Sequence, residues 1–397
     1  MKRGQHKPKP TTVAPLQVVQ ALQSKQTTLE SLQERLGIQA VHHPTLPLVI
    51  LNYHQIASPK THPMVRECRS LCLEKTTWKL VARSFHRFFN WGEVREEQDD
   101  FNFDNFRVDS KEDGSIITIY HYNGGWHANT RQSFGLRPAA AVRQQQQAVS
   151  YTWRQLVCQA LGIHDLDDLD SILTPGYSYV CELTSPYNKV VRSYPDTCLF
   201  LLAVFDARGV EQSPLSADRV AASMGAKRPI TYSFSSLASI QSFLDTQRTA
   251  DPTFEGVVIC DNAHRRWKIK NPSFLLLHKR IGDVSSSVTS PQFLLPFVLK
   301  GERSELLTYY PETQEVFDKT DKAVQRELDA LLQLWEQCRG LEGQRDFAQA
   351  VLGQASNKSM SSILFRVRKD KGGAQDVEQI FRSEEQLVLG AFFLAAL

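Results

Sequence analysis

The chain has 397 residues, of which 42% are hydrophobic and 22% are charged, as in ordinary globular proteins of two or three domains. Its formal net charge of +3 permits a polyanionic partner without requiring one. No apolar run approaches the length of about 18 residues that a membrane-spanning helix needs, so the sequence predicts no such helix.

The seven cysteines are scattered, and none forms a Cys-x-x-Cys pair. This pattern indicates neither a zinc ribbon nor a disulfide framework. Cys68 and Cys72 would share one face of a strand, where we expect them as buried small hydrophobic residues. The sequence therefore predicts a reducing, cytoplasmic protein.

Residues 1–15 are basic and contain prolines, with no apolar segment behind them, which predicts a disordered basic arm rather than a signal peptide. Residues 16–38 carry apolar residues at helical spacing and predict one or two helices. From about residue 48 to residue 269, β-branched and aromatic runs alternate with turn signals, which predicts an antiparallel sheet. Hairpin turns are expected at Asn123–Gly125 and at Asp261–Asn262, and a helix is expected over residues 138–162.

The pattern becomes helical after about residue 275. An apolar stripe of period 3.6 runs through residues 321–338 and is closed by Gly340, and a capping-box pattern from Ser383 to Gln386 predicts a buried terminal helix. Between them lies a basic cluster that is either a solvated loop or a phosphate-binding patch for RNA. The cluster comprises Lys358, Arg366, Arg368, Lys369 and Lys371.

Residues 109–120 read DSKEDGSIITIY. Glu-Asp-Gly is common in polar turns, where Lys111 would be one more solvated charge. The alternative is a nucleophilic lysine at a strand edge, with Gly114 allowing a ligand to approach the backbone.

Further charged residues are placed within the predicted strands. Glu182 lies between apolar residues, and Glu255 opens the segment EGVVIC. Lys268 and Lys270 would point to the same face of a strand that folds back towards Glu255. This arrangement is either a solvent-facing side with cross-strand ion pairs or, together with Arg69 and Arg87, part of an anionic ligand site.

The order of these motifs resembles that of the covalent nucleotidyltransferases, namely the ATP-dependent ligases and the mRNA capping enzymes. Their collinear motifs are K-x-D-G, an acidic strand, E-G followed by apolar residues, and K-x-K. More narrowly, the chain resembles the bacteriophage tRNA-repair RNA ligases (the RNA ligase 1 group) over roughly residues 45–280. The segments CRSL, RSFHRFFNWGE and ELTSPYNKVVRSYPDTCLFLLAVFD carry this narrower resemblance. Ser70 departs from it, because relatives often have glycine or a small apolar residue there.

In that family a lysine attacks the α-phosphorus of ATP, and the resemblance assigns this role to Lys111. It implies that Glu182 contacts the ribose or the metal, and that Glu255 orients a hydrated divalent metal, Mg²⁺ or Mn²⁺. Lys268 and Lys270 would neutralise the phosphates and lower the pKa of Lys111. Phe205 would stack on adenine or would be a plain core phenylalanine. The nucleotide-binding residues implied are Arg69, Arg87, Lys111, Gly114, Arg131, Glu182, Phe205, Lys268 and Lys270.

The resemblance implies an α+β fold. An antiparallel-sheet nucleotidyltransferase domain over residues 16–280 would be followed by a small all-helical C-terminal domain over residues 281–397, which would contribute to RNA or tRNA recognition. The implied activity is ATP-dependent sealing of 5′-phosphate and 3′-hydroxyl RNA ends, such as those of a cleaved tRNA, by a monomer. A lysyl-AMP and an adenylylated RNA 5′ end would be the intermediates. A DNA ligase or capping enzyme would instead need a β-barrel domain after the K-x-K strand, and a non-catalytic RNA-binding relative would need a lost motif.

Overall fold

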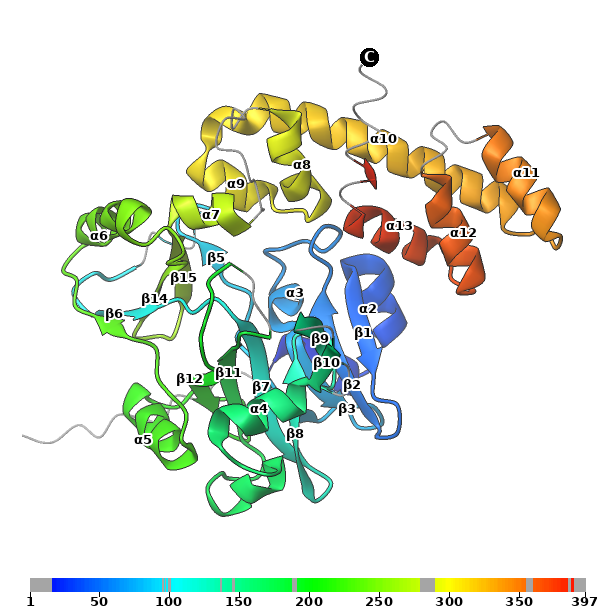
Figure 1. Cartoon of the computed structure of the whole chain (residues 1–397). Coiled ribbons are helices and arrows are strands. Elements are labelled where there is room, and N and C mark those ends of the chain that lie inside the picture. The colour runs from blue at the N-terminus through cyan, green and yellow to red at the C-terminus, as the bar shows by residue number, and fades with distance from the viewer. Residues whose placement is uncertain are drawn as a thin grey trace, which may run out of the picture. The chain divides into compact units, whose positions relative to one another are not determined.

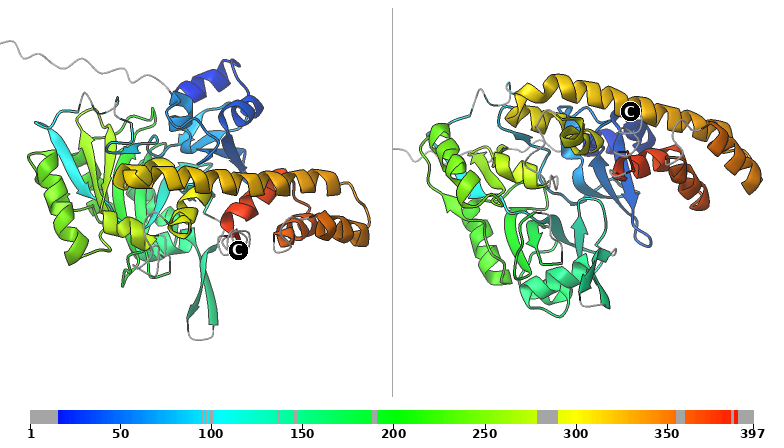
Figure 2. Two further views of the ribbon diagram at one scale, coloured as in Figure 1. Left: turned by 90° about the horizontal axis from the view of Figure 1, so that it is seen from above. Right: turned by 45° about the horizontal axis from the view of Figure 1, so that its top comes forward.

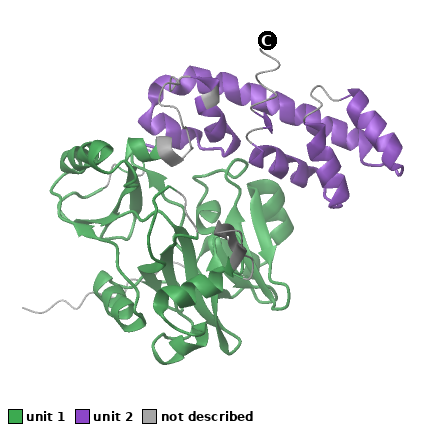
Figure 3. Cartoon of the chain, in the orientation of Figure 1, with its two compact units in different colours: residues 1–91, 96–275 green, residues 92–95, 276–397 purple. Residues whose placement is uncertain are grey.

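The computed structural model describes residues 16–94, 96, 98, 101–135, 138–144, 147–187, 191–278, 290–354, 360–384 and 387–388. The predicted basic arm and Lys358 lie outside the described residues. The chain divides into two compact units, unit 1 with residues 1–91 and 96–275 and unit 2 with residues 92–95 and 276–397 (Figure 3).

Unit 1 begins with a four-stranded antiparallel sheet of order β1-β2-β3-β4 (Figure 1). Its strands are β1 (Ile38–His42), β2 (Leu48–Tyr53), β3 (Arg69–Glu74) and β4 (Leu80–Ala82). Its helices are α1 (Gln17–Gln23), α2 (Leu29–Leu36) and α3 (Pro63–Glu67), so residues 16–38 hold two helices, as predicted. Strand β2 is buried throughout, because Val49 and Leu51 pack with the helices and Leu48 and Ile50 pack with Tyr120.

A second antiparallel sheet has the order β12-β11-β7-β8. Its strands are β7 (Ser115–Tyr122), β8 (Gly125–Thr130), β11 (Ser178–Thr184) and β12 (Cys198–Phe205), and the turn predicted at 123–125 joins β7 to β8. Its helices are α4 (Trp153–Leu161), the 3-10 helix η2 (Leu166–Ser171) and α5 (Pro214–Met224). Apolar residues of one face, such as Ile117 and Leu183, pack with residues of these helices.

The third sheet has the order β13-β6-β14-β15-β5, and all its strand pairs are antiparallel except β15 with β5. Its strands are β5 (Phe89–Asn90), β6 (Phe106–Ser110), β13 (Thr231–Tyr232), β14 (Gly256–Asp261) and β15 (Arg266–Lys270), followed by α7 (Pro272–His278). Helix α6 (Leu237–Ala250) covers one face, where Ile240 and Leu244 pack with Val257 and Ile269. The turn predicted at 261–262 lies at the end of β14 and leads to β15.

The prediction of a helix over residues 138–162 is wrong for its first part. Strands β9 (Pro138–Gln144) and β10 (Gln147–Thr152) pair as an antiparallel hairpin, a teal ribbon that projects from unit 1 in the left view of Figure 2. The helix begins only at Trp153, after a capping box between Thr152 and Gln155. Alanine and glutamine are good helix formers, but helix propensity is a weak determinant, and cross-strand pairing overrides it here.

Unit 2 is helical in its described residues, as predicted. Its helices are α8 (Pro291–Leu299), α9 (Arg303–Tyr309), the 3-10 helix η3 (Pro311–Thr313), α10 (Gln314–Cys338), α11 (Gln344–Gln354), α12 (Ser361–Lys369) and α13 (Ala374–Ser383). The predicted stripe forms the buried side of α10, with Val324, Leu328 and Trp335 in the core. Ser383 ends α13 and so does not begin a helix; most of the predicted terminal helix lies outside the described residues. No helix in the described ranges is both long and apolar enough to cross a membrane.

The seven cysteines are all free thiols, and six of them are buried. Cys68 precedes β3 and Cys72 lies within it, and both are fully buried, as predicted.

The sheets and the helical C-terminal region together confirm the predicted α+β class with antiparallel sheets.

Candidate active site

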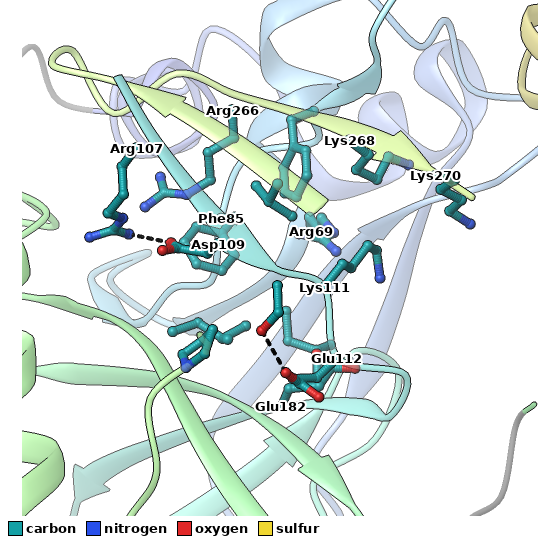
Figure 4. Close-up of a pocket in the computed structure, with 16 residues that line it drawn as sticks. Arg69, Phe85, Arg107, Asp109, Lys111, Glu112, Glu182, Arg266, Lys268 and Lys270 are labelled. Carbon is teal, nitrogen blue, oxygen red and sulfur yellow. Dashed lines mark hydrogen bonds and ion pairs between the residues drawn. The ribbon is translucent and has the colours of Figure 1, made fainter. Parts of the chain in front are cut away.

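A pocket lies between the faces of the second and third sheets that the helices do not cover (Figure 4). Its empty space, counted together with the open solvent at its mouth, is about 850 Å³. Three of the predicted catalytic residues, Lys111, Lys268 and Lys270, lie on one side of it in Figure 4, and Glu182 lies across from them.

Lys111 lies where the chain crosses from the third sheet to the second, between β6 and β7. Its backbone N–H donates to the carbonyl of Gly256 at 2.9 Å, which fixes it beside the start of β14. Its Nζ lies 2.7 Å from Oε1 of Glu255, whose side chain is only 7% exposed. Lys270 reaches the same oxygen from β15, at 3.6 Å. One buried carboxylate therefore holds two lysines together, as the folding back of β15 predicts.

The two lysines of β15 occupy one face of that strand, and Ile269 belongs to the core on the other face. In the register of β14 with β15, Gly256 pairs with Lys270 and Val258 pairs with Lys268. Lys268 therefore lies one strand away from Val258 on the pocket face.

Glu182 reaches the pocket from β11, next to Ile116 of β7. Burial raises the pKa of Glu182 to about 7; the positive charge of Lys111 opposes this shift, and the negative charge of Glu255 adds to it. This carboxylate therefore changes charge near neutral pH, and a bound cation would favour its ionised form.

Asp113 and Gly114 support the loop of the lysine. The Asp113 carboxylate is buried and accepts hydrogen bonds from the N–H groups of Val191 and Arg192, at 2.8 and 2.7 Å. A Cβ at position 114 would come within 2.3 Å of the carbonyl oxygen of Leu183. Glycine is required here because the backbone at position 114 lies close to β11. The sequence instead suggested that this glycine lets a ligand approach the backbone.

Three predicted arginines gather around Tyr53, at the end of β2. The guanidinium groups of Arg87 and Arg131 lie over its ring, at 4.8 and 4.3 Å from the centroid. Burial alone would raise the pKa of Tyr53, but Arg131, Arg69, Arg87 and Lys268 lower it to about 8. Nη1 of Arg69 and Nε of Arg131 are buried and have no hydrogen-bond partner in the part of the chain that the structure describes. Buried donors of this kind favour an anionic ligand.

Of these three arginines, only Arg69 lines the pocket itself; its guanidinium lies 5.3 Å from the ring centroid of Phe88. Phe205 does not line the pocket. It is 3% exposed, packs edge-on against Phe85 and lies beneath the guanidinium of Arg83. The expectation that Phe205 stacks on adenine is therefore wrong, and the core reading of this residue holds.

The basic cluster of unit 2 is partly engaged in packing. Arg366 pairs with Glu384 at 3.1 Å, and Arg368 donates to the carbonyl of Glu342 and lies over the ring of Phe347. Because two of its arginines have protein partners, the cluster offers less free positive charge than the sequence suggested.

Some residues in and around the pocket were not predicted from the sequence. Tyr53 stands in an apolar strand with no local signal that arginines would surround it. Arg266 lines the pocket and donates to Oε2 of Glu211 at 2.8 Å. Although burial opposes the shift, Arg266 and His264 lower the pKa of Glu211 to about 2. Strand alternation could have found Arg266, because it lies two residues before Lys268.

The carboxylates present suit a magnesium-type ion. Among the described residues, no group of three or more His, Cys, Asp or Glu side chains could hold a metal alone. Magnesium commonly binds one or two carboxylates together with substrate phosphates and water. Glu182 lines the lysine-rich pocket, and Glu255 contacts two of its lysines, Lys111 and Lys270, so the two carboxylates fit such a donor set.

The second and third sheets thus bring a lysine, carboxylates and further cations together at one pocket, which is the arrangement that the resemblance in the sequence implies. Residues 67–274, more than half of the chain, match the family model described as RNA ligase. The chain belongs to the RNA ligase family, which confirms the resemblance to RNA ligases that the sequence motifs indicate.

A relative from Autographa californica nuclear polyhedrosis virus, whose name describes a bifunctional polynucleotide kinase/RNA ligase, is 30% identical over 308 residues. The match covers 72% of this chain and 41% of the relative, so the chain spans about two fifths of the length of that protein.

Two solved structures are similar at low sequence identity. An archaeal ATP-dependent RNA ligase is 11% identical with a TM-score of 0.41, over 85% of this chain and 82% of its own. A protein of Aquifex aeolicus named as an ATP-dependent DNA ligase is 14% identical with a TM-score of 0.44, over 83% and 87% of the two chains.

Proposed function

We propose that the chain is an ATP-dependent RNA ligase that seals 5′-phosphate and 3′-hydroxyl ends through a lysyl-AMP. The observation that carries this proposal is the position of Lys111. Its amine lies at the meeting point of two sheets, in contact with Glu255 and beside Lys270 and Glu182. A lysine held at a ligand pocket by one carboxylate and surrounded by cations suits attack on a phosphate.

In the first step, Nζ of Lys111 forms a bond to the α-phosphorus of ATP, and the bond to the β-phosphate oxygen breaks, which releases pyrophosphate. Nζ loses a proton on the way to the phosphoramidate, and Oε1 of Glu255, 2.7 Å away, is placed to accept it. The AMP is then transferred to the RNA 5′-phosphate. Finally, the 3′-hydroxyl attacks that phosphate and AMP leaves.

The surrounding cations have distinct places in this scheme. Lys268 and Lys270 face the α-phosphate from β15, and Arg69, Arg87 and Arg131 around Tyr53 would bind the other phosphates. Glu182 and Glu255 would hold a divalent cation, Mg²⁺ or Mn²⁺, which when bound neutralises phosphate charge. The adenine ring would lie between Val258 of the third sheet and Ile116 and Leu202 of the second.

Two incubations test this function. The protein is mixed with labelled ATP or labelled GTP and a divalent cation, and then with 5′-phosphorylated RNA or DNA. We expect a covalent adenylate from ATP, followed by circularisation of the RNA. A covalent guanylate, or sealing of DNA without sealing of RNA, would favour the capping or DNA ligase alternative.

A pH dependence should follow from Tyr53. Its pKa of about 8 means that above this pH the phenolate neutralises part of the surrounding positive charge and weakens phosphate binding. We expect the KM for ATP in adenylylation to rise about tenfold over the two pH units above that pKa. Tyr53→Phe should abolish this rise, whereas ionisation of ATP itself affects both proteins equally. An identical alkaline rise in wild type and variant would contradict the role of Tyr53.

We further propose that unit 2 contributes to recognition of a structured RNA such as a cleaved tRNA. The exposed Lys369 and Lys371 at the end of α12 support this proposal, since phosphate contacts position an RNA without reading its sequence.

A further inference from the structure

Strand β3 has a bulge next to Arg69, one of the three arginines around Tyr53. The register of β2 with β3 shifts between Leu51 and Asn52, and Asn52 pairs with Arg69, so Ser70 is an extra residue of β3. The φ angle of Ser70 is +58°, in the left-handed region that residues with a side chain rarely adopt. Contacts with the surrounding structure must therefore stabilise this backbone conformation.

The side chain of Asn52 supplies two of these contacts. It is only 1% exposed. Its Oδ1 accepts from the N–H of Ser70 at 2.8 Å, and its Nδ2 donates to the carbonyl of Arg131 at 2.5 Å. The hydroxyl of Ser70 adds a third bond between the same segments, since it donates to the carbonyl of Thr130 at 3.1 Å. One carboxamide therefore joins the backbone beside Arg69 in β3 to the backbone of Arg131 after β8.

The two backbone partners of Asn52 are matched by a carboxamide. An N–H group can only donate and a carbonyl can only accept, so the side chain between them must offer both an acceptor and a donor. An ionised aspartate offers no donor, and an apolar side chain would leave both backbone groups without this bond in a buried place. Asn52 is therefore suited to hold two separate segments of the chain at a fixed spacing.

The segments that Asn52 joins carry arginines with unused hydrogen-bonding capacity. Nη1 of Arg69 and Nε of Arg131 are buried and have no hydrogen-bond partner among the residues that the structure describes. Tyr53 lies beside them, with its N–H fixed by the carbonyl of Cys68 at 2.8 Å and its ring centroid 4.3 Å from the Arg131 guanidinium. A displacement of about 1 Å can cost a group much of its effect on a ligand, so the spacing of these arginines is important.

We propose that Asn52 is a positioning residue, which holds Arg69 and Arg131 at the spacing at which both bind the phosphates of ATP beyond the α-phosphate. This inference rests on the proposed function, since it takes ATP as the ligand. Asn52 does not line the pocket, so it acts on the ligand only through the two arginines. Ligands without a triphosphate, such as AMP, should therefore depend little on Asn52.

The first test compares full-length wild type with Asn52→Ala, in which the two segments lose the bond that joins them. We expect the KM for ATP in adenylylation to rise about tenfold, with the maximal rate within about threefold of wild type. The affinity for AMP, measured by calorimetry, and the sealing of RNA that already carries a 5′-adenylate should be unchanged, because neither ligand has a triphosphate.

The chain offers a matched control at Asn129, a second fully buried asparagine. Asn129 lies two residues before Arg131, but its Oδ1 accepts from the hydroxyl of Tyr120 and joins neither arginine segment to the other. Asn129→Ala therefore removes a buried carboxamide from the same region. It should leave the KM for ATP as in wild type.

The second test needs neither ATP nor activity. Burial raises the pKa of Tyr53, whereas the cations around it, foremost Arg131 and Arg69, lower it to about 8. The midpoint of Tyr53 ionisation therefore reports whether these arginines stay close. Phenolate absorbance, taken as the difference between each protein and its Tyr53→Phe counterpart, measures this midpoint. It should rise by about one pH unit in Asn52→Ala and stay in place in Asn129→Ala.

The possible results separate the two proposals. If wild type forms no covalent adenylate with ATP, the proposed function fails, and the Tyr53 titration still decides the role of Asn52. If the adenylate forms but Asn52→Ala leaves the KM and the midpoint as in wild type, or Asn129→Ala changes them equally, only the role of Asn52 is overturned. Should Asn52→Ala fail to fold, Asn52→Ser takes its place with the same expected results, because its hydroxyl is too short to reach both backbone partners.

Discussion

Replacing Lys111 with alanine is expected to abolish covalent AMP labelling and ligation of RNA that carries a plain 5′-phosphate. The same variant should still seal RNA that already carries a 5′-adenylate, because the final step needs no lysine nucleophile. The reason is the position of Nζ, the amine at the junction of the two sheets that Glu255 holds at 2.7 Å. Gel analysis of labelled protein and of both RNA substrates measures the two outcomes.

The chain offers a matched control for this variant. Lys319→Ala removes a lysine whose Nζ also lies 2.7 Å from a carboxylate, that of Glu315 on the exposed side of α10. It should label and ligate like wild type. Retained labelling in Lys111→Ala would show that another residue is the nucleophile.

Lys268→Ala and Lys270→Ala are each expected to slow adenylylation by about a hundredfold or more, with a much smaller effect on ATP affinity. Both side chains face the pocket from one side of β15, where negative charge would develop on the phosphates during transfer. Lys270 also contacts the carboxylate that holds the nucleophile, so its loss should disturb the position of Lys111 as well. Single-turnover rates measured beside nucleotide affinity separate the two effects.

Arginine should rescue either position poorly, because a planar guanidinium does not replace a compact ammonium charge. A variant that only raises the ATP concentration required, with its maximal rate unchanged, would contradict the proposed role of these lysines in the transfer step.

The candidate site could be predicted from the sequence where a short motif determines geometry by itself. The alternation of a strand places Lys268 and Lys270 on one face, and the hairpin after β14 brings them back to Glu255. The order of the motifs then indicates the family, and this gives Glu182 a place in the site although it lies in a different sheet.

Other features depend on contacts between distant segments, which local patterns do not encode. Three arginines lie near Tyr53, and they come from β3, from the segment after β4 and from the residue that follows β8. No sequence pattern near residue 53 predicts these contacts. Phe205 stands close to Leu202, but Leu202 faces the pocket and Phe205 is in the core. The strands β9 and β10 contain alanines and glutamines, which favour helices, and these strands are stabilised by pairing with each other.

The proposed mechanism requires that Lys111 carries the AMP. The most direct measurement is peptide mass spectrometry of wild-type protein after incubation with ATP and magnesium, without RNA. We expect a single AMP adduct on the peptide that contains Lys111, lost on addition of pyrophosphate. An adduct on Lys268 or Lys270, or no adduct in protein that seals RNA, would contradict it.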